Sequence, residues 1–146
     1  MSKSTIYIKR FLQVIAALHI IVGLFFPWIV DSPLFDHYKQ HLHLAFDTDQ
    51  NVSGQQASFL MAIFGPTIAS WGVLFLFAIN SGFSRPSPQA WWFMFAACVV
   101  WAPYDSIYSL QHGIYLNAII NVVAFVLMMT PLLIVKIHFF SPNHAE

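Results

Sequence analysis

Residues 11–30 read FLQVIAALHIIVGLFFPWIV, a mostly apolar run without a charged side chain. A helix rises about 1.5 Å per residue, so about 20 such residues cross the ~30 Å hydrocarbon core of a bilayer. Three similar runs follow at residues 57–80, 90–110 and 114–139. The strands of a membrane barrel would alternate over about ten residues, unlike these continuous runs. The sequence therefore predicts an all-α integral membrane four-helix bundle, whose backbone amides are satisfied within each helix.

The overall composition agrees with a chain surrounded by lipid. Hydrophobic residues make up 58% of the 146 residues and charged residues 8%, against about 25% charged residues in soluble domains. Little sequence remains outside the apolar runs, so we expect a single four-span domain over residues 1–146. A net charge of +0 provides no basic patch to replace the counterions of phosphates, and we expect no nucleic-acid partner.

The basic residues predict the orientation in the membrane. With four spans, all but one of them fall on the same side: Lys3, Lys9, Arg10, Arg85 and Lys136, with Lys39 opposite. The positive-inside rule then places both termini in the cytoplasm, and we expect a bacterial-type cytoplasmic (inner) membrane. Trp91 and Trp92 lie near a span end, a position typical of rings at the headgroup level.

Each span carries a stripe of small and polar residues. Membrane helices associate through small residues that allow close approach and through polar groups that bond across the interface. The predicted inward stripes are Ala16, His19 and Gly23; Ala62, Gly65, Ala69 and Gly72; Ala102, Asp105, Ser109 and His112; and Asn117, Asn121, Ala124 and Met128. The predicted lipid-facing residues are Ile15, Ile20, Phe25, Phe75, Phe77, Phe93, Val123 and Leu127.

Polar residues are expected to gather in the outer half of the bundle. Asp105 is the only acid inside a span, roughly 8–10 Å below the outer end at 1.5 Å per residue. A carboxylate at this depth costs about 1–3 kcal/mol unless it faces protein or water. Residues at similar depth give the predicted ligand-binding set: Asp105, Ser109, Asn117, Asn121 and Thr67.

Two interpretations of these residues remain open. In the functional one, Asp105 accepts a proton or pairs with a cation, and His19 acts as donor or relay, which makes these two the candidate catalytic residues. In the structural one, Asp105 belongs to a buried network that fixes helix register, and His19 is a satisfied core histidine. Asn117 and Asn121 then bond between helices, at about 0.6 kcal/mol for each bond.

Prolines occur in every span: Pro27, Pro66, Pro103 and Pro131. An interior proline removes one backbone hydrogen bond and pushes away the carbonyl four residues earlier. Pro27, Pro66 and Pro103 lie in the outer half, where kinks would splay the helices and open a vestibule. Proline is also ordinarily frequent in membrane helices, so these prolines can be explained without a vestibule.

The long connection from Asp31 to Gln56 predicts a short amphipathic helix in the first extracytoplasmic loop. Ser32-Pro33 is typical of a helix start, and apolar residues then recur every four positions: Leu34, Tyr38, Leu42 and Phe46. His37 and His41 are one turn apart, a spacing that can chelate a transition metal, with His43 as a further weak candidate. A solvated histidine face explains the same spacing without a metal.

No phosphate-binding loop, dinucleotide fingerprint, nucleophile elbow or HExxH motif occurs in the sequence. The sequence favours a small accessory, assembly or lipid-binding module without catalysis of its own. The alternative is a small membrane enzyme or transporter-like protein that handles an apolar molecule through Asp105 and His19. We expect no cofactor. The expected partners are membrane lipid and either another membrane protein or a second copy of the chain.

Overall fold

The computed structural model describes residues 1–46 and 54–141, without the side chains of residues 34, 43, 45–46 and 54–57. Within this part the chain is helical and contains no strand. Four segments are long and apolar enough to cross a membrane, which confirms the predicted all-α membrane four-helix bundle. The helices are α1 (Lys3–Val30), the 3-10 turn η1 (Pro33–Phe35), α2 (Asp36–Phe46), α3 (Gly54–Ala62), α4 (Phe64–Ser84), α5 (Pro88–Gln111), α6 (Tyr115–Ile134) and α7 (Lys136–Phe140).

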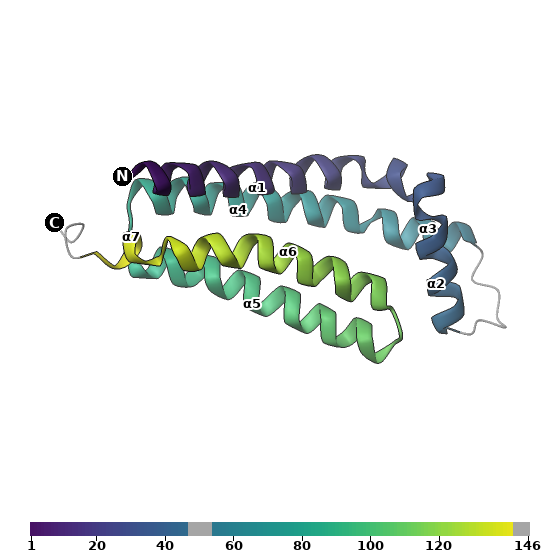
Figure 1. The fold of residues 1–146 in the computed structure, drawn as a ribbon. Helices are drawn as coiled ribbons and strands as arrows, with labels where there is room; N and C mark the ends of the chain where they lie inside the picture. Colours follow the sequence, from purple (N-terminus) through teal and green to yellow (C-terminus); the bar gives the residue numbers. More distant parts are fainter. Residues whose placement is uncertain (47–53, 142–146) are drawn as a thin grey trace.

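The long helices α1, α4, α5 and α6 run side by side, as Figure 1 shows. The start of α1 and the short helix α7 lie at one end, which we call the α7 end. Helices α2 and α3 lie at the opposite end, the α2 end, where α2 runs across the direction of the bundle. Helix α2 occupies the connection in which the sequence predicts an amphipathic helix.

Two of the long helices begin at serine caps. The Ser2 hydroxyl accepts a hydrogen bond from the Thr5 amide at 3.1 Å, so α1 begins well before the predicted residue 11. The Ser87 hydroxyl accepts one from the Ala90 amide at 3.2 Å, with Pro88 in the first turn of α5. A capping side chain satisfies an amide that has no partner within the helix, which stabilises a helix start.

The helix is interrupted at one residue in two of the predicted spans. The span expected over residues 57–80 remains one membrane-spanning segment, Ser58–Ser84, whereas the span expected over residues 114–139 is shortened to Tyr115–Ile134. The first break is at Ile63, between α3 and α4. Pro66 follows it and lacks the amide that would bond to the carbonyl of Ala62. The second break is at Val135, between α6 and α7. The Trp91 indole Nε1 donates to the Leu132 carbonyl at 2.8 Å and satisfies a group left over at the end of α6.

Helices α1 and α4 approach so closely that their backbones touch. A Cβ added to Gly23 would lie 2.6 Å from the Gly65 carbonyl oxygen, and one added to Gly72 would lie 2.9 Å from the Ala16 carbonyl oxygen. Real Cβ atoms do not come this near, so only glycine fits at these two positions. The small-residue stripes predicted for the first two spans are therefore confirmed as a helix–helix seam.

Helices α5 and α6 form an antiparallel hairpin around Gly113. Gly113 has φ of 74°, the left-handed conformation that glycine adopts without steric cost. Its amide donates to the Leu110 carbonyl at 3.1 Å, and the Ile114 amide donates to the Ser109 carbonyl at 2.8 Å. This pair of bonds is a Schellman motif, which ends α5 and turns the chain directly into α6.

The large core side chains lie in the α7-end half of the bundle. They are Leu12, Phe75, Ile79, Phe83, Trp91, Met94, Met128, Leu132 and Phe139. The prediction that Phe75 faces lipid is wrong, because this ring is 4% exposed and stacks on Trp71 at 4.8 Å. Contacts within the α1–α4 and α5–α6 pairs greatly outnumber those between the pairs. The aromatic core at the α7 end is therefore the main connection between the two pairs.

Candidate functional site

In the α2-end half, the buried residues of the described chain are small or polar apart from Val30. A hydrogen-bonded network joins α5 to α6 there. Asn117 Nδ2 donates to Ser109 Oγ at 2.8 Å and to Asp105 Oδ1 at 3.2 Å. The Ser109 hydroxyl donates to the same Asp105 oxygen at 3.3 Å. Ser109 is buried, while Asp105 and Asn117 are half-buried, so the network lies at the margin of the interior.

The local sequence explains why these three side chains meet. Asp105 and Ser109 are four residues apart on α5 and share one helix face. The turn at Gly113 then reverses the chain, which brings Asn117 of α6 alongside Ser109. The Asp105 carboxyl group thus accepts hydrogen bonds from two neutral donors. This arrangement suits an anchor that holds the α5–α6 pair in register.

Asn121 lies one turn further along α6 on the same face as Asn117. Its side chain is 3% exposed, and Nδ2 has no hydrogen-bond partner among the residues that the structure describes. A buried donor without a partner costs about 1–3 kcal/mol. The Asn121 amide is therefore the one buried polar group of this half that the chain itself leaves unsatisfied, within the described ranges.

No family model, curated protein or solved structure matches this chain. The function is therefore inferred from the geometry of the described residues.

Helix α2 brings Tyr38 near the Asp105 network. Burial raises the pKa of the Tyr38 phenol, and the negative charge of Asp105 raises it further. Tyr38 is held in place by an aromatic chain: its ring meets Phe35 edge-on at 5.8 Å, and Phe35 meets Phe26 of α1 at 5.5 Å. The phenol stays protonated at neutral pH and remains a hydrogen-bond donor at the α2 end.

His19 is not joined to Asp105 by any contact in the described structure. Its Nδ1 lies 2.8 Å from the carbonyl oxygen of Ile15, one turn earlier on α1. Its ring packs at 4.9 Å from Trp71, which in turn lies 5.8 Å from Trp101. These contacts are those of a satisfied histidine in an aromatic layer that connects α1, α4 and α5.

Thr67 also lies apart from the network. Its side chain is exposed on α4, whereas the predicted set requires it to turn inward beside Asn117. The four remaining members of that set lie on α5 and α6: Asp105, Ser109, Asn117 and Asn121. Ser106 is a further buried neighbour outside the predicted set, three residues from Ser109 and so on the same side of α5.

The histidines of α2 form a pair and no larger cluster. His41 Nε2 lies 3.2 Å from His37 Nε2, and the rings are perpendicular at 4.6 Å. No group of three or more metal-ligating side chains occurs among the described residues. The side chain of His43, the third candidate ligand, lies outside the described part of the chain.

Proposed function

We propose that this chain is a non-catalytic membrane module that binds a lipid in the α2-end half of its bundle. The ligand has an apolar body and an acceptor oxygen, such as the ester carbonyl of a phospholipid. The five basic residues near the α7 end support a cytoplasmic α7 end under the positive-inside rule. The binding region would then open to the outer leaflet of a bacterial-type cytoplasmic membrane.

The observation that carries the proposal is the Asn121 amide. A donor that is 3% exposed and has no partner within the described chain is satisfied when a ligand supplies an acceptor. Asn117 is already occupied by Asp105 and Ser109, so it fixes the wall of the region and does not compete for the ligand. The Asn121 donor alone would recognise the oxygen of the ligand.

The surroundings of Asn121 favour a lipid over a water-soluble ligand. In Figure 1 the α5–α6 pair inclines away from α1 and α4 toward the α2 end. Among the described residues, the cluster of large core side chains lies at the α7 end, whereas the α2-end half contributes Val30 and otherwise small or polar buried residues. The outward faces of α5 and α6 are apolar, with Val100, Ile107, Ile119 and Val123 exposed. An acyl chain suits such faces, and an ester oxygen suits the amide.

The test is the substitution Asn121→Leu, which keeps the number and branching of the side-chain heavy atoms and removes the donor. We expect the delipidated variant to be about 1 kcal/mol more stable than the wild type, because an unsatisfied buried donor is gone. We also expect it to lose most of the stabilisation that phosphatidylethanolamine gives the wild type. Thermal unfolding in detergent, with and without the added lipid, measures both effects.

Asn80→Leu is the matched control. Gln13 Nε2 donates to Asn80 Oδ1 at 2.6 Å, so this substitution removes a satisfied amide and should lower stability while the lipid response stays intact. Equal lipid stabilisation of Asn121→Leu and the wild type would contradict the proposed site. Substrate turnover by the purified chain that depends on Asp105 and His19 would contradict a non-catalytic role.

A further inference from the structure

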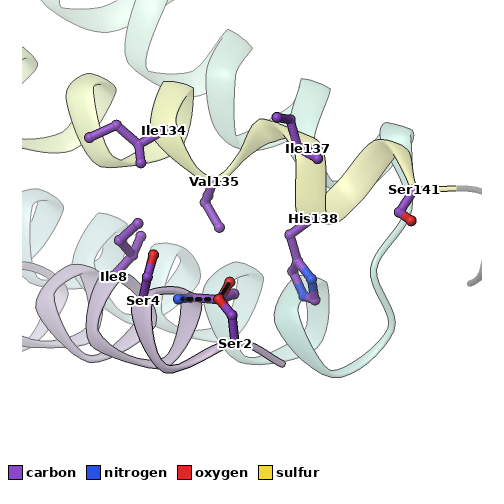
Figure 2. Close-up of a pocket in the computed structure, with 9 residues that line it drawn as sticks. Ser2, Ser4, Ile8, Ile134, Val135, Ile137, His138 and Ser141 are labelled. Carbon is purple, nitrogen blue, oxygen red and sulfur yellow. Dashed lines mark hydrogen bonds between the residues drawn. The ribbon is translucent and has the colours of Figure 1, made fainter.

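A cavity of about 360 Å³ lies at the α7 end, remote from the region near Asn121. One wall is the first turns of α1, and the other is the break between α6 and α7. Figure 2 shows Ser2, Ser4 and Ile8 on one side, with Val135 and His138 facing them from the other. Ligand pockets begin at about 300 Å³, so the space is large enough for a headgroup.

The lining divides into a polar part and an apolar part. The polar part consists of hydroxyl groups and one imidazole: Ser2, Ser4, Thr5, Ser141 and His138. Ile8, Ile134 and Ile137 contribute to the apolar part. Ser2 and Thr5 bond to each other at 2.8 Å, while the Ser4 and Ser141 hydroxyls make no hydrogen bond within the described residues. Hydrogen-bond donors thus lie beside aliphatic side chains, an arrangement that suits a ligand with a polar and an apolar part.

Among the described residues, the charged side chains at this end are basic. Five of the basic residues lie near it, and Lys3 and Lys136 directly adjoin lining residues in the sequence. The carboxylates that the structure describes lie in the other half: Asp31, Asp36 and Asp105. Lys136 is itself held near Trp91, with Nζ 5.1 Å from the ring centroid, so its charge remains at the α7 end. An anion is therefore favoured in the cavity over a cation.

We propose that this cavity binds the phosphate of an anionic lipid headgroup from the leaflet at the α7 end. The hydroxyls of Ser4 and Ser141 would donate to the phosphate oxygens, and the imidazole of His138 would line the same side. The first acyl carbons would leave along Ile8 and Ile137. This site is independent of the proposed function, because it uses different residues at the other end of the bundle.

The experiment compares lipid retention by native mass spectrometry of the full chain released from nanodiscs. The probes are dioleoyl phosphatidic acid and dioleoyl phosphatidylcholine. We expect the wild type to retain the anionic lipid in preference. We expect the double variant Ser4→Ala/Ser141→Ala to retain about tenfold less of it, because two hydrogen bonds to a charged group are lost.

Ser81→Ala/Ser84→Ala is the matched control, since these exposed serines lie near the same end but outside the cavity. It should retain the anionic lipid like the wild type. Equal retention of the two lipids by the wild type, or an unchanged Ser4→Ala/Ser141→Ala variant, would overturn the proposal.

A second variant tests the cavity by filling it. Ser4 is exposed on the first turn of α1, so Ser4→Phe adds a ring without disturbing the core. It should abolish the preference for phosphatidic acid, while Ser84→Phe should not. Competition distinguishes the source of the phosphate. Displacement of the lipid by millimolar inorganic phosphate would assign the site to a soluble phosphate and overturn the lipid assignment.

Discussion

The α1–α4 pair and the α5–α6 pair are held together in different ways. Between α1 and α4 the backbones are in contact at Gly23, Gly65 and Gly72, where no side chain larger than hydrogen fits. Between α5 and α6, in the α2-end half, side-chain hydrogen bonds join Asp105, Ser109 and Asn117. The first interface depends on shape and the second on polar partners.

This difference indicates which pair can respond to a ligand. Close packing of α1 on α4 is favourable in one arrangement only, because moving the two helices apart loses van der Waals contact along the whole seam. Hydrogen bonds can be exchanged for bonds to a ligand at little net cost. The unsatisfied Asn121 amide lies on the polar pair, so we expect adaptation to occur there while α1 and α4 stay fixed.

The largest effect should come from Gly23→Ala. The added methyl would meet the backbone of α4, which cannot shift without opening the seam, and we expect a loss of about 2–3 kcal/mol. Unfolding in sodium dodecyl sulfate, followed by tryptophan fluorescence, measures it. Gly82→Ala is the control, because its Cβ would meet no backbone atom: its nearest contacts are the flexible Met94 Cε at 3.3 Å and the Ala90 Cβ and Phe139 Cε1 atoms at 3.4 Å. Equal losses in the two variants would show that the seam is not rigid.

A smaller loss of stability is expected for Asn117→Ala, a substitution in the α5–α6 pair. It removes both bonds of the Asn117 amide and should cost about 1 kcal/mol, near the upper range for bonds between membrane helices. The same unfolding assay applies, with Gln111→Ala as an exposed control on α5. Asn117→Ala should lower the free energy of unfolding, whereas Asn121→Leu should raise it. If both asparagine substitutions are stabilising, the network does not hold α5 to α6.

The smallest effect concerns the contact between α2 and the polar pair. Burial and the Asp105 charge both raise the pKa of Tyr38. Asp105→Asn removes the charge that disfavours the phenolate, so the Tyr38 pKa should fall toward its ordinary value while remaining raised by burial. The difference in phenolate absorbance between variants with and without Tyr38→Phe measures this pKa. An unchanged pKa would place α2 too far from Asp105 to interact with it.

The sequence was sufficient for the fold class and for the glycine seam. Length and apolar continuity determine the four spans, and spacing at i, i+3 and i+4 places Gly65, Ala69 and Gly72 on one face. The Asp105, Ser109 and Asn117 network also followed, since a short turn forces neighbouring residues of α5 and α6 together.

The rotation of α4 was harder to predict. Periodicity gives the members of a face but not how far around the helix the interior extends, so Thr67 faces outward and Phe75 inward. The break at Val135 depends on the Trp91 indole, which is distant in sequence. The sequence position of Trp91 near a span end is typical of a ring at the headgroup level, but in the structure this ring is buried in the core. The α7-end cavity could not be predicted from the sequence, because one of its walls is the start of α1, which begins at Lys3 and not near residue 11.

The Gly113 hairpin has a consequence for how the protein is made. Helices α5 and α6 emerge one after the other and can dock as soon as α6 has followed the turn out of the ribosome. Helix α1 ends at Val30, whereas its partner α4 begins at Phe64. At about 5–20 residues per second, α1 waits several seconds in the bilayer before the face with Ala16 and Gly23 can pack on α4. During that interval lipid covers the face of α1 that later packs on α4, so the closest helix contact of the fold forms only after α4 has entered the bilayer.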